Sequence, residues 1–157
     1  MASALVCVKD TLIDVKIRIG YYNNEQPFYT DDVSWIRGYS SLKGLAALEA
    51  VTTPSGVLLG WYNDKDSPSL ADVLPPNVIT ICLTYDLGGH ESYAWHEKPL
   101  TTVIEEFVGD EKWRTTTSHF RDFNLVYHNW EEKNEISGFC ERNGLTCCIK
   151  KRAPLDS

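Results

Sequence analysis

Two histidine–glutamate pairs are the residues whose types most directly suggest metal chemistry. His90-Glu91 and His96-Glu97 stand six positions apart. A helical zinc site of the H-E-x-x-H kind needs a second histidine four positions after the first, and Ala94 occupies that place. We therefore expect both pairs to lie on surface hairpins, with no metal ion and no other cofactor bound.

Acidic side chains could instead support hydrolysis. A glycosidase needs two carboxyl groups that face each other across a cleft. In this chain the carboxylates come as adjacent pairs, which are typical of solvated turns. The pairs are Asp31-Asp32, Glu105-Glu106, Asp110-Glu111 and Glu131-Glu132. The pattern favours a protein that is not an enzyme.

The chain has five cysteines, an odd number, and none of them forms a C-x-x-C pair. Zinc-ribbon and thioredoxin-like sites are thereby disfavoured. Free thiols in a reducing compartment are the simplest interpretation, which predicts a cytoplasmic protein. A bridge from Cys140 to Cys147 or Cys148 remains an alternative. The first ten residues lack the basic leader of a signal peptide, so secretion would need a non-classical route.

Length and composition predict one soluble domain over residues 1–157. Hydrophobic residues make up 43% and charged residues 24%, both near the average of globular proteins. No apolar run is long enough to span a bilayer. The net charge of −7 argues against a nucleic-acid partner, because nucleic acid is bound mainly through lysine and arginine.

Several segments alternate apolar and polar residues and are rich in β-branched and aromatic side chains, which is typical of strands. They cover residues 15–22, 57–64, 78–86, 123–129 and 136–140. Turn-forming residues separate them, among them Gly88-Gly89, so the segments are expected to pair as antiparallel hairpins. Residues 99–108 suit either a helix or a strand, and residues 10–14 and 67–73 suit single helical turns.

Two segments 40 positions apart match in kind. Residues 17–24 and 57–64 both read as two aliphatic positions, a glycine, two aromatic residues and an asparagine. Repeats at such a period indicate propellers or other stacked arrays. The expected fold is therefore all-β, with repeated antiparallel hairpins in a propeller-like, barrel or sandwich arrangement.

The order of these motifs resembles the fungal fucose-specific lectin family, whose members are β-propellers. Leu45-Ala46-Ala47-Leu48 precedes residues 57–62 as a small apolar strand precedes an aromatic one in that family. Residues 104–107 before Lys112-Trp113 resemble the end of a blade. The resemblance implies sugar sites between blades, where an arginine and a glutamate bind hydroxyl groups and an aromatic ring packs on the sugar.

No unit of this chain keeps that complete set. The first unit has Arg18 and Trp35, with Asp31 or Asp32 in place of the glutamate. Another unit has Glu106 and Trp113 without the arginine. These six residues are the ligand-binding candidates.

The resulting prediction is a non-enzymatic, lectin-like protein that binds a glycan or glycoprotein. The content of aromatic residues, with five tryptophans and eight tyrosines, also suits a recognition surface. The alternative is a protein–protein interaction module or effector with a degenerate lectin-like β fold, because the sugar-binding set is incomplete. Assembly into a homo-oligomer stays open, since so few units do not easily close a ring.

Overall fold

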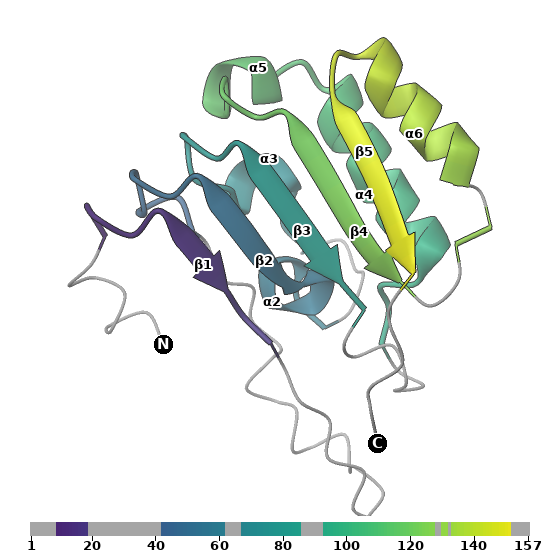
Figure 1. Cartoon of the computed structure of the whole chain (residues 1–157), viewed down its shortest axis with the longest axis horizontal. Helices are drawn as coiled ribbons and strands as arrows, with labels where there is room; N and C mark the ends of the chain where they lie inside the picture. Colours follow the sequence, from purple (N-terminus) through teal and green to yellow (C-terminus); the bar gives the residue numbers. More distant parts are fainter. Residues whose placement is uncertain are drawn as a thin grey trace, which may run out of the picture.

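A computed structural model describes residues 9–18, 42–61, 67–85, 93–127, 130–131 and 133–151 (Figure 1). Its centre is one sheet of five strands that are neighbours in sequence order. The strands are β1 (Asp14–Lys16), β2 (Ala50–Pro54), β3 (Thr80–Thr84), β4 (Asp122–Tyr127) and β5 (Thr146–Lys151). Every neighbouring pair is parallel.

Five helices lie in the connections between these strands. They are α2 (Ser55–Leu59), α3 (Leu70–Val73), α4 (Glu97–Gly109), α5 (Trp113–Thr116) and α6 (Lys133–Arg142). Parallel neighbours need crossover connections, and such crossovers are almost always right-handed. When the strands also follow sequence order, every crossover runs over the same face of the sheet.

Figure 1 shows this one-sided arrangement. The helices α2, α3 and α4 lie behind the sheet, α5 lies near the amino-terminal ends of β3 and β4, and α6 lies beside β5. No labelled helix lies in front of the sheet. In the described part of the chain, the sheet thus has one face covered by helices and one face without them.

The amino-acid sequence of the strands explains which face is covered. Buried and half-buried residues alternate along β3 and β4. Ile81, Leu83, Phe123 and Leu125 are all buried completely on the helical face. Aromatic rings extend this core, since Phe123 packs edge-to-face against Phe120 with ring centroids 4.8 Å apart. Burial of these apolar side chains is the main force that holds the helices to the sheet.

The amino-terminal ends of the strands share a repeated hydrogen-bonding pattern. The carbonyl oxygen of Ile13 accepts the N–H groups of Glu49 and Ala50 at 2.8 and 3.1 Å. The carbonyls of Glu49 and Ile79 each accept two N–H groups from the next strand in the same way, and Arg121 accepts one from Thr146. This pattern fixes the register, so residues at equal positions in each strand lie in straight rows across the sheet.

The prediction of an all-β fold of antiparallel hairpins, whether propeller, barrel or sandwich, is wrong. The strands are parallel, and the 37 residues between β3 and β4 contain α4 and α5. Residues 136–140 belong to α6 rather than to a returning strand. The Gly88-Gly89 turn lies outside the described residues.

The two segments of the predicted 40-residue repeat also differ in conformation at the positions where both are described. Ile17 continues the pairing of β1, since its N–H group binds the carbonyl of Thr52 at 2.7 Å. Its counterpart Val57 lies in the buried helix α2. The two segments therefore share residue types without sharing a conformation.

No helix in the described ranges combines the length and the apolar character that crossing a bilayer requires.

Candidate functional site

The candidate site is the face of the sheet that carries no described helix, here called the open face. Strand register places its side chains in three rows. The first row holds Asp14, Ala50, Thr80, Asp122 and Thr146. The second holds Lys16, Thr52, Cys82, Asn124 and Cys148. The third holds Pro54, Thr84, Val126 and Lys150.

Most side chains of the open face are short and polar. Thr80, Cys82, Asn124 and Cys148 are half-buried, whereas the residues that alternate with them in β3 and β4 are buried. Within the first row, the hydroxyl of Thr80 donates to the carboxylate of Asp122 at 3.3 Å. The face is thus a flat surface of hydrogen-bonding groups and thiols, with few large apolar side chains.

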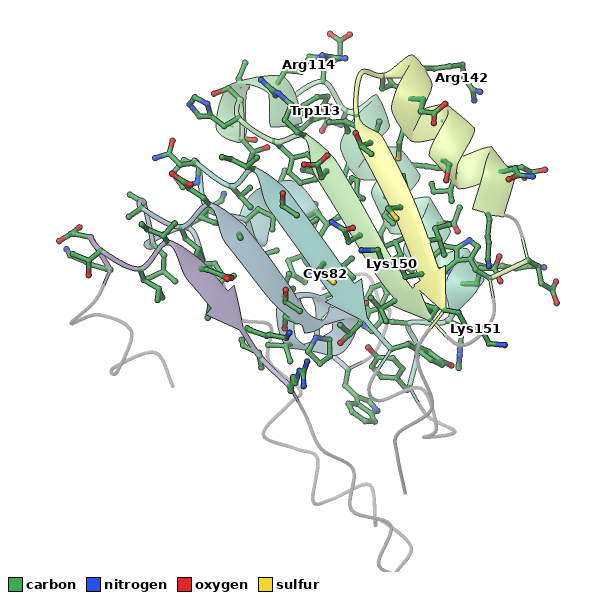
Figure 2. All side chains as sticks on the ribbon, in the orientation of Figure 1. Cys82, Trp113, Arg114, Arg142, Lys150 and Lys151 are labelled. Atoms are coloured by element: carbon green, nitrogen blue, oxygen red, sulfur yellow. The ribbon has the colours of Figure 1, made fainter. Side chains whose placement is uncertain are left out.

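Charge on the open face is found in its outer parts. Asp14 and Asp122 lie in the first row, at the amino-terminal ends of the strands. Lys16 lies on the edge strand β1, and Lys150 lies on the edge strand β5. Figure 2 shows Lys150 and Lys151 near the end of β5, with Cys82 near the middle of the sheet. The centre of the face, around Cys82 and Asn124, is uncharged.

The carboxyl-terminal ends of the strands are filled by aromatic side chains. Ligands of open α/β sheets commonly bind at this end. Here the ring of Tyr127 stacks on Tyr85 with centroids 4.8 Å apart and meets Trp130 edge-to-face at 4.8 Å. Tyr93 also belongs to this cluster, and its hydroxyl accepts the N–H of Gly56 at 3.0 Å. Packed rings therefore occupy the usual ligand position.

The hydroxyls in that aromatic cluster do not form a nucleophile with a base. The Ser55 and Tyr127 hydroxyls are 3.2 Å apart. Burial raises the pKa of Tyr127 far above its ordinary value, so its hydroxyl stays protonated. The His96 ring bonds to the Tyr85 hydroxyl at 2.7 Å rather than to Ser55. The arrangement is that of a packed core with satisfied hydroxyl groups.

The sugar-binding candidates from the sequence are not gathered in one place. Arg18 is exposed just beyond the end of β1. Glu106 is exposed on α4, where it lines a hollow between α3 and α4, and Trp113 lies in α5 on the helical side. Trp35, Asp31 and Asp32 lie outside the described residues.

Trp113 has a structural environment. Only 3% of its surface is exposed, and its indole N–H donates to the carbonyl of Val108 at 3.0 Å. The guanidinium of Arg114 covers the ring, 4.5 Å from the centroid (Figure 2). A ring enclosed in this way has no free face for a sugar. Carbohydrate binding by the six candidates stays a prediction.

The four cysteines in the described part of the chain are free thiols, and Cys7 lies outside it. Cys140 on α6 donates a hydrogen bond to Cys147 on β5, which lowers the pKa of Cys147, while the same bond and burial raise the pKa of Cys140. The pair joins α6 to the edge of the sheet. No disulfide is present among these four cysteines, and Cys140 and Cys147 are one of the pairs for which a bridge was the alternative.

No protein-family model, curated protein or solved structure matches this chain significantly. Sequence analysis did not single out the open-face residues, although the alternation of Thr80, Cys82 and Thr84 with Ile81 and Leu83 was a usable signal for a sheet with only one covered face.

Proposed function

We propose that this chain is a protein-interaction module that binds a partner protein through the open face of its sheet. One observation carries the proposal. All five strands are parallel, yet the described helices cover one face alone. Parallel sheets are ordinarily covered on both faces, because each face presents rows of side chains and backbone that pack against another layer. A partner protein would supply the missing layer.

The chemistry of the open face supports a protein as the partner. Protein interfaces have a core depleted of charged residues and a polar or charged rim. The uncharged centre around Cys82 and Asn124, with Lys16, Lys150 and the two aspartates outside it, follows this pattern. A complementary partner would offer hydrogen-bonding groups at the centre, basic groups opposite Asp14 and Asp122, and acidic groups opposite the lysines.

The size of the open face sets the expected strength of binding. Five strands about 4.8 Å apart and three rows about 6.7 Å apart give a surface of roughly 24 by 20 Å. This is about half of the roughly 800 Å² that each partner contributes to a standard interface. We therefore expect a transient complex, with a dissociation constant on the order of micromolar, unless a neighbouring surface also takes part.

Substituting Asn124→Arg should abolish partner binding. The residue lies in the middle row of the open face, and a long cation there would hold a flat partner surface away and bury a charge against it. We expect affinity to fall at least about a hundredfold, which corresponds to roughly 3 kcal/mol. The measurement is affinity capture from cells that express the chain, followed by calorimetry with the purified partner.

The matched control is Asn134→Arg, which makes the same chemical change at an exposed position in the first turn of α6. It should bind as the unmodified chain does, and both variants should keep their melting temperature. Equal affinity of the two variants for the captured partner would show that binding occurs elsewhere.

A further inference from the structure

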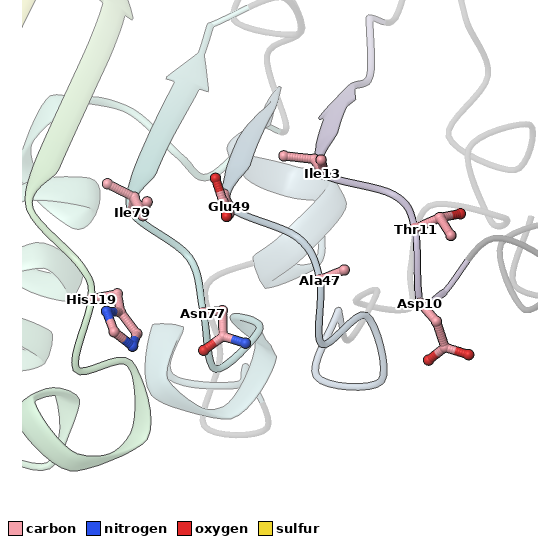
Figure 3. Close-up of a pocket in the computed structure, with 8 residues that line it drawn as sticks. All are labelled: Asp10, Thr11, Ile13, Ala47, Glu49, Asn77, Ile79 and His119. Atoms are coloured by element: carbon pink, nitrogen blue, oxygen red, sulfur yellow. The ribbon is translucent and has the colours of Figure 1, made fainter.

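A second surface lies at the amino-terminal end of the sheet. The segments that lead into β1, β2 and β3 and the turn before β4 surround an open hollow of about 540 Å³ (Figure 3). Eight residues line it: Asp10, Thr11, Ile13, Ala47, Glu49, Asn77, Ile79 and His119. We propose that this hollow, here called the amino-end hollow, binds a long cationic side chain, lysine or arginine, of a partner protein.

The apolar walls are the first observation. Ile13 is 57% exposed and Ile79 is 36% exposed, and among the described residues they are the only large hydrophobic side chains that are exposed. Both line the hollow, where Ala47 adds a small apolar surface. Solvated isoleucines before β1 and β3, on either side of β2, form a site for an aliphatic chain, because contact with one removes their surface from water.

The carboxylates are the second observation. Figure 3 places the side chain of Glu49 between Ile13 and Ile79, with Asp10 at the far side of the hollow. The ion pairs in the described part of the chain are Lys43–Asp72 and Lys112–Asp110, and neither involves these two carboxylates. Among the described residues, no lysine or arginine lines the hollow.

The arginine that follows this part of the sequence makes its hydrogen bonds outside the hollow. Arg121 directs its guanidinium to the carbonyls of Ser118 and Phe120, at 3.1 and 2.6 Å. It therefore leaves the hollow with two carboxylates and apolar walls. Lysine and arginine side chains are complementary to such a surface. Their aliphatic stem packs on apolar side chains, and their charged end pairs with a carboxylate.

The backbone holds the hollow in shape. The carbonyls of Ile13, Glu49 and Ile79 each accept two N–H groups from the following strand, so the bases of the three side chains keep fixed spacing. The amide of Asn77 donates to the carbonyl of Ala46 at 2.7 Å, which ties the turn before β3 to the turn before β2. The partner's side chain would enter a surface that is already formed, so little ordering would oppose binding.

This inference does not depend on the proposed role of the open face. The amino-end hollow borders the first row of the open face, because Ile13, Glu49 and Ile79 directly precede Asp14, Ala50 and Thr80. A partner that covers the open face could extend into it, and a partner could equally use the hollow alone. The two proposals are tested with different variants and different probes.

The test is a titration of the full chain, labelled with carbon-13 in its isoleucine methyl groups, at pH 7 and constant ionic strength. The probes are N-acetyl-argininamide and N-acetyl-lysinamide, with the neutral N-acetyl-citrullinamide and N-acetyl-norleucinamide as comparators. We expect the methyl signals of Ile13 and Ile79 to shift with a dissociation constant on the order of 10 mM for the cations. The neutral probes should bind at least about fivefold more weakly. The ratio of the two cationic affinities identifies which side chain the hollow prefers.

Substituting Glu49→Gln should reduce this difference between cationic and neutral probes, because of the two carboxylates only that of Asp10 remains. Glu49 is exposed and its backbone, not its side chain, holds the strands, so the variant should fold normally. The control Glu135→Gln removes the same charge from an exposed position on α6 and should leave the titration unchanged. Equal shifts with citrulline, or cation binding in Glu49→Gln as strong as in the unmodified chain, would overturn the proposal.

Discussion

Replacing Phe123 with alanine should lower the free energy of unfolding by about 3–5 kcal/mol. Phe123 is completely buried on the helical face of β4. Its ring packs edge-to-face against Phe120 at 4.8 Å and against Phe107 at 6.0 Å, so it links the sheet to α4. Truncation removes these apolar contacts and leaves a cavity between the sheet and α4, which other core contacts keep in place. The loss would be a large share of the roughly 5–15 kcal/mol that stabilises a typical domain.

The neighbouring substitution Asn124→Ala is the control. Asn124 follows Phe123 in β4 and points to the open face, so its removal should cost less than about 1 kcal/mol. Urea denaturation of both variants measures the difference, provided that their m-values agree. Similar losses at the two positions would contradict a sheet that is covered on one face only.

Substituting Gly56→Ala should destabilise the fold by about 1–3 kcal/mol, although alanine is normally the better helix former. Gly56 lies in α2, and a β-carbon there would stand 2.9 Å from Cε2 of Tyr93. Attractive carbon–carbon contacts need about 3.5–4.0 Å. Tyr93 cannot easily retreat, because its hydroxyl binds the Gly56 N–H and its ring meets Trp61 with centroids 5.3 Å apart.

Gly109→Ala gives the matched comparison, since an added β-carbon at the end of α4 meets no atom within 4 Å. We expect no loss of stability there, and thermal unfolding of the two variants side by side is the measurement. A Gly56→Ala protein that melts at or above the temperature of the unmodified chain would show that Tyr93 does not close over α2 as described.

Part of the fold could be predicted from the sequence. Strands were expected within residues 78–86 and 123–129, where β3 and β4 lie, and a helix was one alternative for residues 99–108, where α4 lies. A helical turn within residues 67–73 agrees with α3. These segments have clear period-two or helical patterns, so local chemistry is sufficient to assign them.

Other elements were assigned incorrectly for identifiable reasons. All five residues of α2 are buried, so the helix has no polar side and its short apolar run is indistinguishable from a strand. In α6 the buried residues Ile136 and Cys140 are four positions apart, which is a helical spacing that the strand interpretation overlooked. No strand was predicted for residues 146–151, where β5 lies.

The same sequence feature explains both the wrong fold class and the missed site. Strands in parallel sheets are usually apolar throughout, whereas half-exposed antiparallel strands alternate. Thr80, Cys82 and Thr84 alternate with buried Ile81 and Leu83, so the pattern favoured antiparallel hairpins. The alternation has another cause in this chain, namely a parallel sheet with helices on one face. Strand direction depends on the long connections, which residue alternation does not encode.

The most direct test of the central proposal is site-specific photo-crosslinking from the open face. The photoreactive residue p-benzoylphenylalanine would replace Thr146 or Lys150, which are exposed at the edge of that face on β5, and Asn134 or Thr102 on the exposed surfaces of α6 and α4. We expect the same partner protein to be cross-linked from positions 146 and 150 and from neither helix position. Cross-links from the helices alone, or equal cross-links from all four positions, would contradict the proposal that the open face binds the partner.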